Sequence, residues 1–225
     1  MKNLIVLLFV LGTMSFVIEA KERVYLIDTG IPESLGNQCG PQIRYDNQTV
    51  HSHGIHMVTE IYKEAKNVDY CIQSYDVYDE EEKTIPVSSI VKALRHIATQ
   101  PVGIINMSMD GGYGDIIEQR WLRHLAKLGY TINIASGNDG KDLRMGCTSY
   151  PACYFRLPTS NVNVISNKEP YANTQGPVTH VGDLPTVKAG TSGSTARFTG
   201  KLIKDRESNF RFYNVTPRSN YVTSL

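Results

Sequence analysis

Short runs of β-branched and apolar residues alternate along this chain with longer stretches whose apolar residues recur at helical spacing. Extended runs are predicted at residues 24–27, 68–77, 102–107, 130–135 and 162–166. Parallel strands need a crossover between them, and a helix commonly supplies it. The alternation therefore predicts an α/β fold: a compact three-layer sandwich in which helices flank both faces of a mainly parallel sheet.

Three helices are expected between these strands, and a fourth is expected to begin at residues 190–194. Ser88 or Ser89 is expected to cap the second helix, whereas Asp115 opens the third and Gly129 ends it. The apolar faces are predicted to contain Ile55, Val58, Ile61 and Tyr62 in the first helix, Ile90, Ala93, Leu94 and Ile97 in the second, and Ile116, Ile117, Trp121, Leu125 and Leu128 in the third.

Charge excludes one class of partner. Lys and Arg together number 23 against 22 Asp and Glu, which gives a formal net charge of +1, and no basic block interrupts the chain. Nucleic-acid binding leaves a basic patch or stripe, and none is present in the sequence. With 41% hydrophobic residues the chain can build a core. We therefore expect a globular protein without a nucleic-acid partner. A monomer is also expected, although neither charge nor composition determines the oligomeric state.

The N-terminus has the order of a secretory signal. Lys2 precedes an apolar run at residues 4–11, and small residues lead to Ala20, after which cleavage is expected. The alternative is a membrane anchor, but the run is shorter than the ~20 apolar residues that span a bilayer. The sequence thus predicts a signal peptide at residues 1–20, one domain at residues 21–205 and a C-terminal extension at residues 206–225. The protein is expected to be secreted or periplasmic, with no stable membrane anchor after cleavage.

Four cysteines in an exported chain indicate two disulfides out of three possible pairings. We pair Cys39 with Cys71 and Cys147 with Cys153, because each pair is near in sequence. The alternative is that all four are free buried thiols.

Side chains that carry chemistry follow the ends of three predicted strands and open two predicted helices. Ligands of open parallel sheets bind off the carboxyl ends of the strands, so these positions are where chemistry is expected. They comprise Asp28, Thr29 and Gly30; Ser108, Met109, Asp110, Gly111 and Gly112; Ala135, Ser136, Gly137 and Asn138; His51, His53 and His56; and Gly190, Thr191 and Ser192.

Four of these residues have the properties that acyl transfer requires. The hydroxyl of Ser192 becomes a strong nucleophile when a base such as His53 takes its proton, and the carboxylate of Asp28 orients that imidazole and stabilises its charged form. The amide of Asn138 and the backbone N–H of Ser192 are expected to bind the developing oxyanion.

The order Asp, His, Ser and the surrounding residues resemble the subtilisin-like serine proteases. Six segments carry the resemblance between residues 24 and 200. They are similar to the aspartate motif (24–30), the histidine motif (53–58, with Ile55 in the usual threonine place), the strand that lines the substrate cleft (105–109), the oxyanion segment (135–140), the wall of the specificity pocket (150–152) and the nucleophile motif (190–192), and Gly200 also fits.

The resemblance implies a serine endopeptidase that hydrolyses protein or peptide substrates through an acyl-enzyme and needs no cofactor. Its catalytic residues would be Asp28, His53 and Ser192, with Asn138 in the oxyanion hole. The implied substrate-binding residues are Ser108, Met109, Asp110, Ala135, Ser136 and Gly137.

The chain also departs from the family pattern. Ala196 stands where a proline is usual, Asp110 where a glycine is usual beside the cleft, and Arg197 where histidine is common. These changes bear on specificity. The helix after His53 runs directly to Val68, so we expect no calcium site of the kind that many members carry there, and no other metal site. Seven residues precede Asp28 after the expected cleavage site, so the sequence predicts folding without a prosegment.

Other interpretations remain open at the level of sequence. Asp28, Thr29 and Gly30 also resemble the aspartic protease motif, although that fold is all-β. His51, His53 and His56 suggest a zinc cluster without a fourth ligand, in which case His53 is not a base; in the family pattern His56 is structural and His51 has no role. Ser192 alone is typical of a helix cap, and residues 111–114 weakly suggest phosphate binding, although we interpret them as the cleft loop. The chain could also be a secreted binding module with an inactive site.

Overall fold

The computed structural model describes residues 21–35, 37–45 and 52–215. The predicted signal peptide therefore lies outside the described residues. In chain order the elements are β1 (Glu22–Asp28), β2 (Ile43–Arg44), α1 (Ser52–Glu64), β3 (Tyr70–Asp76), α2 (Val87–Ile97), β4 (Ile104–Met107), α3 (Ile116–Lys127), β5 (Thr131–Ala135), a 3₁₀ helix (Ala152–Phe155), β6 (Val162–Ser166), β7 (His180–Val181) and α4 (Gly190–Val215).

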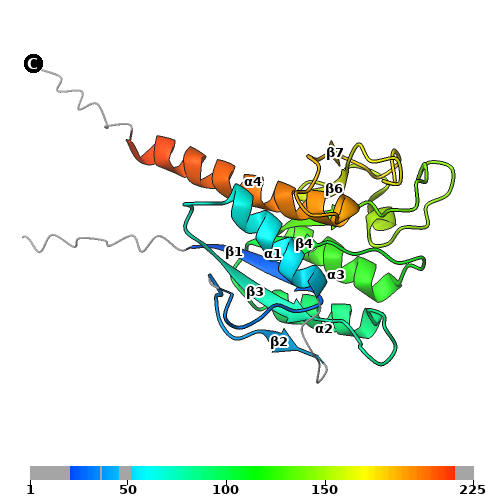
Figure 1. The fold of residues 1–225 in the computed structure, drawn as a ribbon, viewed down its shortest axis with the longest axis horizontal. Coiled ribbons are helices and arrows are strands. Elements are labelled where there is room, and N and C mark those ends of the chain that lie inside the picture. Colours follow the sequence, from blue (N-terminus) through cyan, green and yellow to red (C-terminus); the bar gives the residue numbers. More distant parts are fainter. Residues whose placement is uncertain (1–20, 36, 46–51, 216–225) are drawn as a thin grey trace, which may run out of the picture.

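The strands form one sheet in the order β2-β3-β1-β4-β5-β6-β7, and every pair is parallel. Helices α1 and α4 pack against one face and α2 and α3 against the other (Figure 1). In β1, Val24 and Leu26 contact the first pair of helices, whereas Tyr25 and Ile27 contact the second. This arrangement confirms the predicted α/β sandwich with a parallel sheet covered on both faces.

The helix faces agree with the prediction except in α1 and α3. Ile116 and Ile117 of α3 are 56% and 45% exposed, and Leu128, which follows α3 as its C-cap, is 46% exposed. Tyr62 of α1 is 54% exposed, so these four predictions are wrong. The buried face of α3 consists of Glu118, Leu122, Leu125 and Ala126. A face that contains a buried carboxyl is invisible to a search for apolar periodicity.

Of the two predicted helix starts, the one at α3 is confirmed and the one at α2 is wrong. Asp115 caps α3 as predicted, because its carboxylate accepts from the backbone N–H groups of Ile117 and Glu118. In contrast, α2 begins directly after Pro86, and neither Ser88 nor Ser89 is its cap. Proline suits this position because it has no N–H to leave unpaired at a helix start.

Helix α4 is long, and its C-terminal half extends beyond the rest of the domain (Figure 1). It continues without interruption past residue 205, where the sequence suggested a boundary. In the part of the chain that the structure describes, no helix is long and apolar enough to cross a bilayer.

Candidate active site

Asp28 and His53 are brought together by the packing of α1 on the end of β1. Asp28 is the last residue of β1 and is buried. The carboxylate oxygen Oδ1 accepts from the backbone N–H of Thr29 at 2.8 Å and lies 2.7 Å from Nδ1 of His53. The imidazole is about one-third exposed. A buried carboxylate thus holds one nitrogen of a partly exposed ring.

The start of α1 is fixed by a close backbone contact. The backbone N–H of Gly54 donates to Oγ1 of Thr29 at 2.9 Å. A Cβ at position 54 would lie 2.1 Å from the carbonyl oxygen of Gly30, closer than any real side chain can approach. Glycine is therefore required beside His53, because only its absent side chain lets α1 reach the end of β1.

The protonation of His53 is controlled by two opposing effects. Burial of the imidazole disfavours its charged form, but the charge of Asp28 and the hydrogen bond to it favour that form. The net result is that the pKa of His53 is raised above its ordinary value. The ring is thus a stronger base than an isolated imidazole.

Ser192 lies in the first turn of α4 and is 7% exposed. Its Oγ donates to the carbonyl oxygen of Ser108 at 2.7 Å, and Oγ of Ser108 donates to the carbonyl oxygen of Ser192 at 2.9 Å. Ser108 directly follows β4. This reciprocal pair fastens the start of α4 to the carboxyl end of the sheet.

A buried chain of hydrogen bonds continues from this pair across the sheet, with every group donating to the next. Asn163 donates to Asn133, Asn133 to Oγ1 of Thr199, Thr199 to Asn106, and Asn106 to Oγ of Ser108, at 2.8–2.9 Å. Each buried side chain has a partner, so the chain adds rigidity without leaving a polar group unsatisfied. It ties β4, β5 and β6 to α4, and thereby to Ser192.

Asn138 lies at the N-terminus of α4. Its Oδ1 accepts from the backbone N–H of Thr191 at 2.9 Å. Gly190 has φ +53°, and a Cβ there would lie 2.4 Å from Oδ1 of Asn138. The left-handed glycine makes room for the amide, whose Nδ2 is then a donor beside the first turn of α4. This is the place expected of an oxyanion ligand.

The helices that carry His53 and Ser192 are also tied to each other. Nε of Arg197, on α4, donates to Glu64 of α1 at 2.8 Å. Glu60 of α1 is fully buried, and its Oε1 accepts from the backbone N–H groups of Thr186 and Val187 at 3.0 and 3.1 Å. These contacts hold the segment that leads into α4, so the relative position of the two helices is fixed from α1.

The predicted substrate-binding residues fall into two groups. The side chains of Ser108, Ala135 and Ser136 are buried, so these residues would meet a substrate through their backbone. Gly137 follows them, Met109 is half-buried, and Asp110 is exposed. Asp110 is therefore the residue of this set whose polar side chain is exposed.

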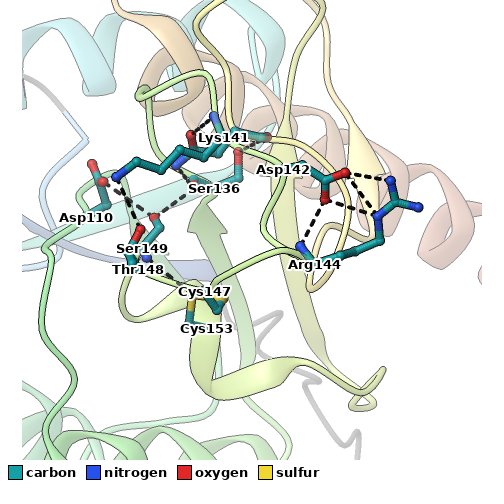
Figure 2. Close-up of a disulfide and its surroundings, with 10 residues drawn as sticks. Asp110, Ser136, Lys141, Asp142, Arg144, Cys147, Thr148, Ser149 and Cys153 are labelled. Atoms are coloured by element: carbon teal, nitrogen blue, oxygen red, sulfur yellow. Dashed lines mark hydrogen bonds and ion pairs between the residues drawn. A yellow bond between two sulfur atoms is a disulfide. The ribbon is translucent and has the colours of Figure 1, made fainter.

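Asp110 is held at the wall formed by a disulfide-closed loop (Figure 2). Ser149 donates through Oγ to the carbonyl oxygen of Ser136 at 2.7 Å, and this Oγ lies 3.4 Å from Oδ2 of Asp110. Its backbone N–H donates to Sγ of Cys153 at 3.3 Å. Partial burial of the carboxyl and the nearby charge of Asp139 raise the pKa of Asp110, against the opposing effects of Ser149 and Lys141.

Both predicted disulfides are present. Cys39 is bonded to Cys71, next to the start of β3, and Cys147 to Cys153 in the wall beside Asp110. Their Cα atoms lie 5.0 and 5.6 Å apart, within the usual range.

The structure describes two of the three histidines that suggested a zinc cluster, His53 and His56. His56 is exposed on α1, and His51 lies outside the described residues. Among the residues that the structure describes, no group of three or more His, Cys, Asp and Glu side chains is arranged to hold a metal ion.

Sequence reasoning missed two buried acids, Glu60 and Glu118. Glu60 lies on the same face of α1 as Met57 and Ile61, and a carboxylate on an apolar face is itself a signal of a specific partner. Glu118 follows Asp115 by three residues, which is the spacing of a capping box. Both signals were present in the sequence, although neither names the partner.

Comparison with solved structures identifies proteins with a similar fold. A cold-adapted subtilisin-like serine proteinase is similar with a TM-score of 0.65 and 20% identity, covering 83% of this chain and 76% of that chain. A lanthipeptide protease is similar with a TM-score of 0.68 and 18% identity, covering 87% of this chain and 76% of that chain. The prenylagaramide maturation protease PagA is similar with a TM-score of 0.61 and 16% identity, covering 83% of this chain and 77% of that chain. No protein-family model and no curated protein sequence matches the chain. The chain thus has the fold of the subtilisin-like serine proteases.

Proposed function

We propose that this protein is a serine endopeptidase that hydrolyses peptide bonds through Asp28, His53 and Ser192, with Asn138 in the oxyanion hole. The observation that carries the proposal is the 2.7 Å contact between Nδ1 of His53 and the buried carboxylate of Asp28. A buried acid that orients a partly exposed imidazole is the arrangement that makes the other ring nitrogen a general base.

The residues divide the reaction among them. For attack on a substrate carbonyl, the hydroxyl proton of Ser192 is redirected from the carbonyl oxygen of Ser108 to Nε2 of His53, because one hydroxyl hydrogen serves one acceptor at a time. Asp28 stabilises the imidazolium that forms. The leaving amine then takes this proton, and a water molecule, deprotonated by His53, releases the acyl group from Ser192.

The oxyanion is stabilised by groups that are already in place. Nδ2 of Asn138 and the backbone N–H of Ser192 lie at the N-terminus of α4, whose dipole favours negative charge. Their positions are held by Gly190 and by the hydrogen bond from Thr191. Little reorganisation is therefore required as the charge develops.

The substrate and setting are part of the same proposal. Two of the similar structures are named as a lanthipeptide protease and a maturation protease, which supports a peptide or protein substrate. The two disulfides are typical of exported proteins, which supports secretion after removal of residues 1–20. We further propose a monomeric domain at residues 21–205 followed by an extension at residues 206–225, the first part of which continues helix α4.

A fluorophosphonate probe tests the function directly. We expect the purified protein to be labelled at Ser192 and to hydrolyse peptides, and Ser192→Ala to lose both properties while remaining folded. The loss in kcat is expected to be about 10⁶-fold, the magnitude known for subtilisin. Ser208→Ala is the matched control, since Ser208 lies on the same helix with its side chain exposed.

The rival functions give different results in the same assay. A folded protein that binds peptides but is neither labelled nor active would be the inactive binding module. Hydrolysis that survives Ser192→Ala and stops with pepstatin would indicate the aspartic protease chemistry of Asp28, and would overturn the proposal.

A further inference from the structure

A small pocket opens beside the cleft residues Met109 and Asp110. Its volume of about 70 Å³ is several times the ~10–15 Å³ that a single water molecule needs. Its lining includes Ile85, Val87, Ile90, Asp110, Gly111 and Glu118. The pocket therefore combines an apolar wall with two carboxyl groups, and it admits the end of a side chain.

The fold alone accounts for only part of the buried position of Glu118 in this pocket. It is 2% exposed and lies in the first turn of α3, three residues after the cap Asp115. In an ordinary capping box the glutamate would bond to the N–H of the cap residue. Here the hydroxyl of Tyr154 stands between them: it accepts from the N–H of Asp115 and donates to Oε2 of Glu118 at 2.7 Å.

This structural role uses only one oxygen of the carboxyl group. Oε1 of Glu118 is buried, and it has no hydrogen-bond partner in the part of the chain that the structure describes. Burial is also the main reason that the pKa of Glu118 is raised to about 7, with Asp115 adding to the rise and Tyr154 opposing it. A buried carboxylate without a counter-charge is costly, and a cation in the pocket would remove that cost.

The remaining walls fit a cation on an alkyl stem. Ile85, Val87 and Ile90 offer apolar contact to methylene groups, and Asp110 adds a second negative charge at the same pocket. A lysine or arginine side chain has this composition, an apolar stem with a charged end. A purely apolar side chain would leave Oε1 of Glu118 buried and unpaired.

The pocket also lies at a suitable distance from Ser192. Ser108 contacts Ser192 directly, and Gly111 follows it by three residues, which in extended chain corresponds to roughly 10 Å. A peptide that extends along residues 108–111 would therefore place in the pocket a side chain a few residues away from the bond that is cut.

We propose that this pocket binds a basic side chain of the peptide substrate, two to four residues from the scissile bond, and that Glu118 is the residue that selects it. The inference rests on the proposed protease function, because it assigns a part of the substrate to that site. It goes beyond that function by naming a substrate class and a specificity residue distant from the catalytic groups.

Peptides with lysine or norleucine at one position at a time test this proposal, because the two side chains share the stem and differ in charge. We expect one position, two to four residues from the cut, at which lysine raises kcat/KM about 10- to 100-fold over norleucine. Glu118→Gln should lower this ratio toward 1, since glutamine can still accept from Tyr154 but carries no charge. Because Asp110 keeps its charge in that variant, the ratio should come close to 1 only when Asp110→Asn is added. Glu82→Gln, in an exposed loop outside the pocket, is the control and should leave the ratio as in the parent.

A second measurement keeps the pocket testable if no peptide is cleaved. In Ser192→Ala protein labelled with ¹³C at glutamate carboxyl carbons, the Glu118 signal is titrated with saturating n-butylammonium or n-butanol. We expect butylammonium, and not butanol, to move the titration midpoint below 7. Lack of hydrolysis together with this shift would reject the protease function but retain the cation pocket. A lysine preference as large in Glu118→Gln as in the parent, the absence of any lysine preference in an active enzyme, or equal titration with both compounds would overturn the proposal.

Discussion

Nδ1 of His53 lies 2.7 Å from Oδ1 of Asp28, an atom that also accepts from the backbone N–H of Thr29. The carboxylate is therefore held from two sides, and it is the main reason that the charged form of His53 is favoured in spite of burial. Since a general base must be neutral to accept a proton, this contact determines the pH range in which the proposed enzyme works.

The first prediction concerns that pH range. Because the pKa of His53 is raised, kcat/KM should rise with pH and reach half its maximum above the ordinary histidine value of about 6.5. The stability that the Asp28 contact contributes has the opposite dependence: it is fully present below about pH 6.5 and is lost as the pH rises through the folded pKa of His53. Profiles of kcat/KM and of the free energy of unfolding against pH measure the two effects.

Asp28→Asn removes the cause of the shift. The midpoint for His53 should fall below that of the parent, because burial then acts alone, and kcat should drop by about 10⁴-fold as the tautomer is no longer held. NMR titration of the imidazole checks this, with His180 on β7 as an internal control whose titration should not change. An identical His53 midpoint in both proteins would contradict the assignment of Asp28.

Asn138 can be tested by a pair of variants that separates its two atoms. Asn138→Ala removes both the oxyanion donor and the acceptor for Thr191, so kcat should fall about 10²- to 10³-fold, as in subtilisin, with a loss of stability of about 1 kcal/mol. Asn138→Asp keeps the acceptor and suits the helix N-terminus, but it replaces the donor with a negative charge. This variant should be as stable as the parent and at least as inactive as Asn138→Ala. Full activity in Asn138→Asp would rule out a donor role.

The buried chain of hydrogen bonds provides a stability prediction. Thr199→Val keeps the shape but leaves Asn133 without an acceptor and Asn106 without a donor, so the free energy of unfolding should fall by about 2–4 kcal/mol. Thr199→Ser retains the hydroxyl and loses one methyl, which should cost about 1 kcal/mol. Urea denaturation of both proteins measures the difference. Equal losses would mean that the methyl group of Thr199, and not its hydrogen bonds, determines the stability contributed at this position.

The two disulfides are expected to affect different properties. They close loops with sequence separations of 32 and 6 residues, so by chain entropy Cys39–Cys71 contributes about 3–4 kcal/mol and Cys147–Cys153 about 2 kcal/mol. Replacing Cys39 and Cys71 by serine should therefore lower stability more. Replacing Cys147 and Cys153 should raise KM more, because that loop carries Ser149 against Asp110 (Figure 2). Thermal unfolding and peptide kinetics on both double variants test this, and the reverse order in either property would count against it.

Asp110 gives the last prediction. If its carboxylate attracts a basic substrate side chain, Asp110→Asn should lower kcat/KM for lysine or arginine substrates more than for leucine or phenylalanine substrates, and more strongly at low salt, where charges are less screened. Asp69→Asn is the matched control, since Asp69 is exposed, paired with Lys21 and lies just before β3, at the opposite end of the strands from Asp110. A uniform effect on all four substrates would show that Asp110 shapes the site without reading charge.

Helix α3 shows where sequence patterns fail. Its predicted face placed Ile116 and Ile117 inward, whereas the buried face begins at Glu118 and continues with Leu122. Farther along the helix the prediction is confirmed, because Leu125 is buried and Trp121 packs against the core. Apolar periodicity treats every glutamate as solvent-facing. The partner that allows Glu118 to be buried is Tyr154, which is 36 residues away, and no local pattern connects the two. Strands β2 and β7, each only two residues long, escaped prediction because so short a pairing leaves no periodicity.

The sequence by itself determined the alternation of strands and helices, and with it the parallel sheet whose carboxyl ends collect Asp28, Ser108 and Asn138. These features depend on apolar periodicity and turn residues, which act over a few neighbouring positions. The tertiary structure alone decided which groups meet: the contact of Gly54 with Gly30 that delivers His53 to Asp28, the hydrogen bonds between Ser108 and Ser192, and the pocket around Glu118. Those contacts join residues 24 to 84 positions apart, and their energies depend on burial and on the donor that happens to face each acceptor, which only the packed chain specifies.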